Sequence, residues 1–268
     1  NYLEGYQLTQ NDSYKDVAVQ ILNWVTAEMI HDAGGFYSAV DAGRFEEEGD
    51  YYVWTYSELE NELSESELKV LSTYFDISEG GNFEDGKIVL NLRNSNQLSV
   101  LQDPEFSHIR EKLSKARQKR EYPHLDDKIL VAWNGRMVAA FCKAYQLLGK
   151  VDYLEYCQKT MSFIKENLCR KEGLSRSWRN GKVSGRAVLN DYAFLIEGLL
   201  ALYQSDFDSK WLEWAIELQD RQDDLFWDGE AGGYYLNDGV DTHILVRSKV
   251  FGDSSMPSGN GVSAYNLL

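Results

Sequence analysis

The sequence has few of the residues that build redox centres. It contains three cysteines, Cys142, Cys157 and Cys169, which lie 15 and 12 residues apart and form no CxxC pair. An odd number of widely spaced cysteines indicates reduced thiols in a protein core rather than a disulfide framework. Reduced thiols are typical of a reducing compartment, so the sequence predicts a cytoplasmic protein.

Metal-binding patterns are also missing. The four histidines have neither HxxxH nor HxH spacing: they are His31, His108, His124 and His243. A zinc site is therefore not expected, and His124, just ahead of Asp126, is the histidine to consider for proton transfer. The acidic run at 46–50 lacks the alternating spacing of a calcium loop, so we expect it to face solvent. No metal and no cofactor are expected.

Long apolar runs and an excess of positive charge are absent as well. Hydrophobic residues make up 43% of the chain, but the mean hydropathy is -0.45, and no apolar run approaches the 18 or more residues of a membrane span. Acidic residues outnumber Lys and Arg by 43 to 27, a formal charge of -16 that would repel a phosphate backbone. Neither a membrane nor a nucleic acid is therefore an expected partner.

Aromatic residues are abundant, at 13% of the chain with 7 Trp and 17 Tyr. Many of them lie in glycine-rich loops outside the apolar faces. They are typical of a surface that stacks on sugars, although large helical cores also use Trp and Tyr. Both interpretations stay open at this point.

A unit of two helix-length patterns occurs three times along the chain. Each copy has a Tyr-Gln pair at the end of an apolar stretch, at Tyr6, Tyr145 and Tyr203, and another aromatic residue 8 positions later. A glycine turn opens 28, 28 and 29 residues after the Tyr, at 34, 173 and 232. One helical hairpin cannot bury its apolar face alone, so this period predicts hairpins packed side by side.

These proportions predict a mainly α fold, a single (α/α)6 toroid domain over 1–268 with short β-hairpins in its loops. Residues from 43 to about 120 depart from the repeat and are expected to be an irregular insertion or a modified hairpin. The chain begins with Asn1 and stops inside an apolar run. We therefore expect both ends to be cut and the ring to be incomplete.

Local patterns predict the individual elements. Helices are expected at 12–30, 104–119, 129–148, 152–168, 189–203 and 209–225, and another from Pro257. Capping patterns at Ser57 and Ser64 predict two short acidic helices. Residues 51–55 are expected to form a strand, and 232–250 a β-hairpin around Asn237-Asp238-Gly239.

The inner helices of such a ring all run the same way, so their N-termini and the glycine loops should share one face. Polar residues at these positions are candidates for a cavity: Asp41, Asp126, Asp127, Lys128, Asn190, Asp191, Ser258 and Asn260. Carboxylates that converge on an aromatic cavity suit glycoside chemistry, with one group as acid and another as base or nucleophile. The sequence predicts Asp127 and Asp191 as this pair.

Each candidate also has a structural interpretation. Asp126 or Asp127 could cap the inner helix that follows, and Lys128 could pair with a neighbouring acid. Asp191 opens an apolar helix, where a buried acid needs a partner or a role. Asp41 could form an Asx turn, and Ser258 is expected to be an N-cap.

Several blocks together resemble the spermatogenesis-associated, YyaL-like family of thioredoxin-domain-containing proteins. The resemblance covers almost the whole chain through residues 34–39, 41–42, 47–49, 52–55, 126–130, 133–135, 191–200 and 257–260. It implies a six-hairpin toroid related to glycosidases and to N-acylglucosamine and cellobiose 2-epimerases, preceded by a thioredoxin-like domain that is absent here. The histidine pairs that these epimerases use are not recognisable, which puts an epimerase mechanism in doubt.

We therefore expect a carbohydrate-active domain that hydrolyses or isomerises a small sugar. Besides the acids, the residues expected to bind the sugar are Asp41, Trp54, Lys128, Trp133, Asn134, Tyr192, Ser258 and Asn260. The alternative is a non-catalytic toroid that binds a sugar or a protein and works with the thioredoxin-like domain. An isoprenoid-processing toroid is disfavoured because the sequence has no DDxxD motif.

Overall fold

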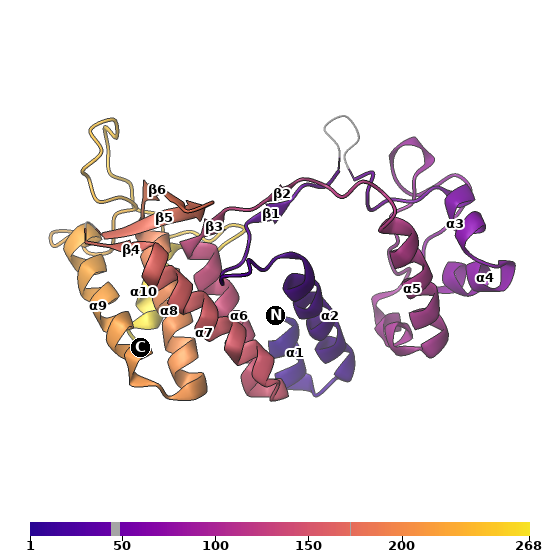
Figure 1. Cartoon of the computed structure of the whole chain (residues 1–268), viewed down its shortest axis with the longest axis horizontal. Coiled ribbons are helices and arrows are strands. Elements are labelled where there is room, and N and C mark those ends of the chain that lie inside the picture. The colour runs from indigo at the N-terminus through magenta and orange to yellow at the C-terminus, as the bar shows by residue number, and fades with distance from the viewer. Residues whose placement is uncertain (44–48, 172) are drawn as a thin grey trace. The chain divides into compact units, whose positions relative to one another are not determined.

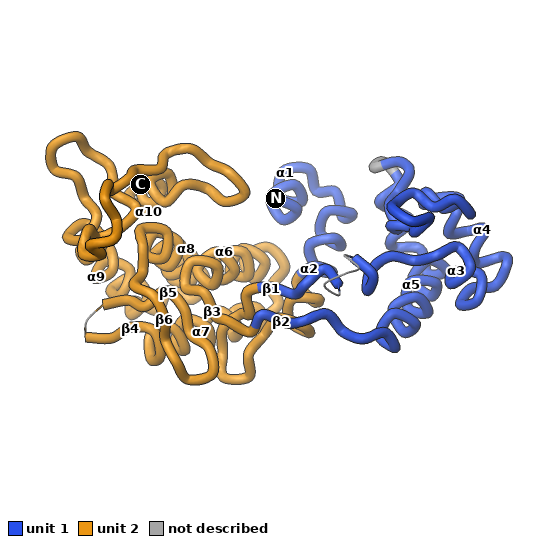
Figure 2. Tube along the Cα trace, turned by 90° about the horizontal axis from the view of Figure 1, so that it is seen from above, with its two compact units in different colours: residues 1–21, 39–126 blue, residues 22–38, 127–268 orange. Residues whose placement is uncertain are grey.

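A computed structural model describes residues 1–43, 49–171 and 173–268; the acidic residues at 46–48 lie outside the described part. Two compact units make up the chain (Figure 2). Unit 1 comprises residues 1–21 and 39–126, and unit 2 comprises 22–38 and 127–268. Helices predominate in both units, which confirms the mainly α prediction (Figure 1). No helix in the described ranges is long and apolar enough to cross a membrane.

Unit 1 has a hydrophobic core of its own, built from short helices. Its elements are α1 (Tyr2–Thr9), the start of α2 (Asp12–Glu28), β1 (Ala39–Val40), α3 (Tyr56–Glu62), α4 (Glu65–Tyr74), η1 (Glu84–Gly86), η2 (Ser95–Gln102), α5 (Pro104–Arg117) and β2 (Leu125–Asp126). Buried Leu59, Phe106 and Ile109 lie at the centre of this core. Within the predicted insertion, residues 54–116 therefore pack as a helical cluster around their own apolar side chains.

Two predictions in unit 1 need correction. None of the described residues 51–55 lies in a strand; Trp54 forms an isolated bridge with Ile88, and the backbone turns at Gly49. The first short helix is capped by Thr55 instead of Ser57, because Glu58 completes a capping box with Thr55. The predicted cap at Ser64 is confirmed by the same reciprocal bonds with Glu67.

Unit 2 contains two complete helical hairpins and the first helix of a third. Its elements are the end of α2, β3 (Ile129–Leu130), α6 (Val131–Leu148), α7 (Val151–Asn167), β4 (Cys169–Arg170), β5 (Gly173–Arg179), β6 (Lys182–Arg186), α8 (Leu189–Asp206), α9 (Ser209–Phe226) and α10 (Gly259–Asn266). Helices α6, α8 and α10 are the successive inner helices. The central one, α8, has six consecutive buried residues from Asp191 to Ile196. An apolar helix contacted on several sides confirms the predicted inner position.

The inner helices pack with their backbones close together. Gly135 of α6 faces α8, and a Cβ at this position would overlap the carbonyl oxygen of Phe194 and lie 2.7 Å from the Leu195 nitrogen. A Cβ on Gly198 of α8 would lie 2.6 Å from the Gly135 oxygen. Both positions therefore require glycine for packing.

A small antiparallel sheet lies at the ends of the helices where α6 and α8 begin (Figure 1). Strand β5 pairs with β3, β4 and β6, with Ile129 opposite Trp178. Asn180 and Gly181 turn the chain between β5 and β6 with φ of 50° and 78°, as a tight hairpin requires. The predicted hairpin at 232–250 is wrong, because only Tyr234 there forms a bridge, with Trp227.

Main-chain hydrogen bonds reproduce the sequence repeat. Helices α1, α6 and α8 each end at a C-cap residue with a left-handed backbone conformation: Gln10, Gly149 and Phe207. The N–H of each C-cap residue donates to the carbonyl of the repeat tyrosine. After each outer helix the chain turns at a glycine, and a main-chain N–H beyond the turn donates a hydrogen bond to a carbonyl at the end of that helix. Tyr37 donates to Met29, Ser175 to Leu168 and Tyr235 to Phe226. The three copies therefore share one backbone geometry.

Candidate functional site

The predicted site residues are divided between the two units. Asp41, Trp54 and Asp126 belong to unit 1, and the others belong to unit 2. Asp126 lies on β2 opposite Ala39 of β1, and the Asp41 N–H donates to the His124 carbonyl at 2.9 Å. These two acids therefore lie on neighbouring segments of unit 1, while the sites below are built within unit 2.

Asp191 holds the N-termini of two inner helices together. Its Oδ2 accepts from the Val188 N–H at 2.9 Å and its Oδ1 from the Ala132 N–H at 3.3 Å. Ala132 is in the first turn of α6, whose N-cap position is occupied by Leu130 without a side-chain hydrogen bond. The predicted capping of this helix by Asp126 or Asp127 is therefore wrong; β3 precedes α6, and Asp191 accepts from its first turn instead.

Asp191 is only 1% exposed, and this burial raises the pKa of its carboxyl to about 6, against the hydrogen bonds from Val188 and Ala132 and the charge of Arg176. Since this folded-state pKa lies above that of an unfolded Asp, the folded state binds more protons between about pH 4 and 6. We expect the stabilising contribution of protonated Asp191 to the free energy of unfolding to be fully present below about pH 4. As pH rises through 6, the free energy of unfolding should lose up to about 3 kcal/mol.

Chemical denaturation from pH 4 to 7 measures this effect. Asp191→Asn should remove this part of the pH dependence, while Asp152→Asn, at an exposed site on α7, should keep the wild-type profile. Equal pH profiles for Asp191→Asn and the wild type would contradict the assignment.

Asn134 and Asn260 secure two of the glycine loops in the same way. Asn134 Oδ1 accepts from the Phe36 N–H at 2.6 Å, and its Nδ2 donates to the carbonyls of Phe36 and Leu130. Asn260 Oδ1 accepts from the Tyr234 N–H at 2.7 Å, and its Nδ2 donates to the Tyr234 and Val250 carbonyls. Each amide clasps the aromatic residue that follows a Gly-Gly pair, which leaves these side chains few free bonds for a ligand.

The other predicted binding residues on α8 and α10 are also buried. Tyr192 is 2% exposed; burial raises its pKa, and a hydrogen bond with the Leu174 backbone opposes this. Ser258 Oγ accepts from the Gly261 N–H at 3.0 Å, which confirms the predicted N-cap. By contrast, Trp133 in the first turn of α6 is 44% exposed.

Asp127 lies in a group of side chains that we call the His31 cluster: His31, Tyr37, Asp127, Trp178 and Arg179. The Asp127 side chain is 29% exposed, and its buried Oδ1 forms an ion pair with Arg179. The His31 ring packs edge-on against Tyr37 and Trp178, with centroids 5.9 and 5.1 Å apart. Aromatic rings, an accessible carboxylate and a guanidinium thus meet at the end of unit 2 where β3 leads into α6.

Tyr37 and His31 are the two proton-carrying rings of the His31 cluster. Burial raises the pKa of Tyr37, and the charges of Asp32 and Asp127 raise it further, so its hydroxyl keeps its proton at neutral pH. His31 Nδ1 accepts from the Ala33 N–H at 3.1 Å, which places the proton of the neutral ring on Nε2. The cluster therefore contains a carboxylate that can accept a proton and a phenol that stays protonated and can donate a hydrogen bond.

The sequence identified only Asp127 of this cluster. Ile129 opposite Trp178 in the β3–β5 register brings the strand beside the Asp127 loop, and this pairing was not predicted. Asn180-Gly181 is the hairpin signal that could have placed Trp178 and Arg179 on a strand. Among the described residues, no group of three or more His, Cys, Asp or Glu is arranged to hold a metal.

Comparison with known proteins gives relatives along the whole chain. The chain is 35% identical over 312 aligned residues to spermatogenesis-associated protein 20 of Homo sapiens. It is 30% identical over 307 aligned residues to an uncharacterised protein of Caenorhabditis elegans. The alignments include 100% of this chain but 39% and 42% of those proteins, so the chain spans about two fifths of their length. No family model matches.

Solved structures with similar coordinates include three sugar-processing proteins. A sugar epimerase from a ruminal bacterium has a TM-score of 0.42 at 13% identity and covers 83% of this chain and 56% of its own. A D-mannose isomerase has a TM-score of 0.42 at 16% identity, covering 99% and 83%. A family 76 glycoside hydrolase from Bacteroides thetaiotaomicron has a TM-score of 0.40 at 16% identity, covering 83% and 44%.

Proposed function

The chain is a homologue of the spermatogenesis-associated protein 20 family along its whole length, and we propose that in this setting it binds and processes a small carbohydrate. The observation that carries the proposal is the His31 cluster. There a partly exposed carboxylate lies beside aromatic rings at the N-terminal end of an inner helix. Sugar-processing sites combine these two features, since rings pack against the apolar face of a sugar and carboxylates move its protons.

Within the cluster, Asp127 supplies the carboxylate and Arg179 orients it. Tyr37 stays protonated at neutral pH, because burial and the nearby Asp32 and Asp127 charges raise its pKa, and we assign its hydroxyl as a hydrogen-bond donor to the substrate. Glycoside hydrolysis and sugar isomerisation both need such a pair of one charged and one protonated group. Trp133 and Lys128 are the neighbouring residues that we assign to substrate binding.

The pairing of Asp127 with Asp191 is a second version of the same proposal. Near neutral pH, a pKa of about 6 suits an acid–base group. However, both Asp191 oxygens accept main-chain hydrogen bonds, and the side chain is buried. In this version Asp191 contacts the substrate only after those main-chain hydrogen bonds are exchanged.

Asp127→Asn is expected to lower turnover of an accepted sugar by about 10²–10⁴-fold, because it removes the proton acceptor while keeping its size. The measurement is an NMR assay of anomer formation or isomerisation on a panel of mono- and disaccharides. Tyr37→Phe should produce a loss of similar size if Asp127 works with Tyr37. A comparable loss in Asp191→Asn would instead support the version in which Asp127 works with Asp191. Asp152→Asn is the matched control. Full turnover of every accepted sugar by Asp127→Asn would refute the proposal.

A non-catalytic toroid that binds a sugar or a protein, working with a thioredoxin-like domain, is the second candidate. It is favoured by the same Asp191 bonds, which give this acid a structural task. Saturable binding of a sugar without turnover, unchanged in Asp127→Asn, would support this candidate over the first.

A further inference from the structure

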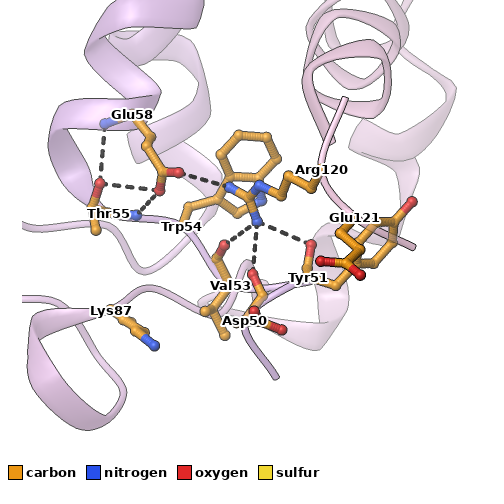
Figure 3. Close-up of a pocket in the computed structure, with 9 residues that line it drawn as sticks. All are labelled: Asp50, Tyr51, Val53, Trp54, Thr55, Glu58, Lys87, Arg120 and Glu121. Atoms are coloured by element: carbon orange, nitrogen blue, oxygen red, sulfur yellow. Dashed lines mark hydrogen bonds and ion pairs between the residues drawn. The ribbon is translucent and has the colours of Figure 1, made fainter. Parts of the chain in front are cut away.

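Unit 1 contains a pocket that is separate from the residues discussed above as catalytic. Its volume is about 400 Å³, within the range of small-molecule sites. Its walls come from the loop that leads into α3, from Lys87, and from Arg120 and Glu121 after α5 (Figure 3). Trp54, which the sequence indicated as a sugar-binding residue, contributes to this wall and is otherwise buried at 4% exposure.

Arg120 makes the wall rigid. One of its nitrogens donates to the carbonyls of Asp50, Tyr51 and Val53 at 3.0, 2.9 and 2.7 Å, and another donates to Glu58 at 3.1 Å (Figure 3). The guanidinium also lies over the Trp54 ring, 4.3 Å from its centroid. These bonds hold a loop, a helix start and an indole ring in one geometry.

Further bonds fix the same segment from the other side. The backbones of Trp54 and Ile88 exchange hydrogen bonds of 2.9 and 2.6 Å, which places Lys87 beside the loop. Glu58 also accepts from the Thr55 N–H at 2.7 Å in the capping box. A pocket whose walls are held in this way loses little conformational freedom when a ligand binds.

Two charged side chains in the pocket are available for a ligand. Within the described part of the chain, the Lys87 ammonium and the Glu121 carboxylate have no hydrogen-bond or ion-pair partner. Figure 3 shows them on opposite sides of Arg120. The Arg120 donors are largely used by the wall, so Lys87 and Glu121 are the groups that can meet a ligand.

The balance of charges selects the class of ligand. The lining contains three carboxylates, Asp50, Glu58 and Glu121, and two cations, Lys87 and Arg120. An anion would face the carboxylates, and a cation would face the ammonium. A hydroxyl group both donates and accepts hydrogen bonds, so a neutral polyol can bond to Glu121 and Lys87 together through charge-assisted bonds.

We propose that this pocket is a second sugar site, which binds a neutral mono- or disaccharide between Lys87 and Glu121. Tyr51 and Trp54 are the aromatic residues of the pocket wall, and each presents only an edge, since they are 6% and 4% exposed. The site binds its ligand independently of the His31 cluster and takes no part in turnover. It gives unit 1 a task in holding carbohydrate.

Amide chemical shifts test the proposal, because they localise binding. D-glucose, D-mannose and cellobiose are titrated into the labelled full chain, with inorganic phosphate and glycylglycine as an anion and a zwitterion. At least one sugar should give saturable shifts at Tyr51, Thr55 and Lys87. Lys87→Met and Glu121→Gln should each weaken this binding about tenfold or more, through loss of a charge-assisted bond.

Lys69→Met is the matched control, since Lys69 is exposed on α4 of the same unit, and it should bind as the wild type does. Asp127→Asn should also keep the pocket shifts, so loss of turnover and loss of pocket binding can be told apart. Absence of saturable shifts with all three sugars would overturn the proposal. So would pocket shifts with phosphate or glycylglycine alone, or unchanged sugar affinity in both pocket variants.

Discussion

Gly135→Ala is expected to destabilise unit 2 by about 3 kcal/mol or more, at the upper end of overpacking effects. The added methyl group would overlap the Phe194 carbonyl and approach the Leu195 nitrogen. Both are main-chain atoms of a buried helix, so the strain cannot be relieved by a side-chain rotation. The two inner helices would have to separate, which would open the packing of α6 against α8. Chemical denaturation followed by far-ultraviolet circular dichroism measures the loss.

Gly229→Ala provides the matched comparison. A Cβ at Gly229 meets no atom within 4 Å, so this variant should unfold within about 0.5 kcal/mol of the wild type, as an ordinary surface substitution does. Equal stability of Gly135→Ala and Gly229→Ala would show that α6 and α8 are not packed as closely as described.

Asn134→Ala is expected to cost about 3 kcal/mol or more. Three hydrogen bonds disappear, and the Phe36 N–H and the carbonyls of Phe36 and Leu130 lose these partners. Each buried polar group left without a partner costs about 1–3 kcal/mol. The loop should also open locally, so hydrogen exchange at the Phe36 amide is expected to accelerate beyond the global change.

Asn134→Asp distinguishes the effect of the two hydrogen bonds that Asn134 donates from the effect of the one that it accepts. It keeps an oxygen for the Phe36 N–H but removes both donated bonds, so the Phe36 amide should stay better protected than in Asn134→Ala. Asn23→Ala, at an exposed position of α2, controls for a change of Asn to Ala in a helix. If Asn134→Ala unfolds as Asn23→Ala does, the clasp does not stabilise the loop.

The helices were predictable because their signals are local. Caps and apolar periodicity located α4, α5, α7, α9 and α10 to within a few residues. The errors arose where distant residues decide. Residues 51–55 have strand-forming side chains, but Trp54 pairs with Ile88 for a single bridge, because Arg120 binds the surrounding carbonyls. In the loop at 232–250, Arg247 donates to the Asn237 and Leu225 carbonyls, which leaves no ladder.

Candidate acids could be selected from the sequence, but their surroundings could not. Asp191 stood out because an apolar helix rarely begins with a buried acid. Its bond to Ala132 joins residues 59 positions apart, and no local pattern encodes such a contact. The same holds for Asp127, whose partner Arg179 comes from a strand that pairs in an unforeseen register. Positions of polar residues were thus predictable, and their partners were not.

The hydrogen bonds that repeat in the hairpins α1–α2, α6–α7 and α8–α9 affect how far the sequences of these hairpins can diverge in evolution. They join main-chain atoms: the cap N–H to the tyrosine carbonyl, and the loop N–H to the end of the outer helix. A substitution leaves those atoms in place. One left-handed position can therefore be Gln10, Gly149 or Phe207 in different copies, and duplicated hairpins can drift apart in sequence while retaining a common connection.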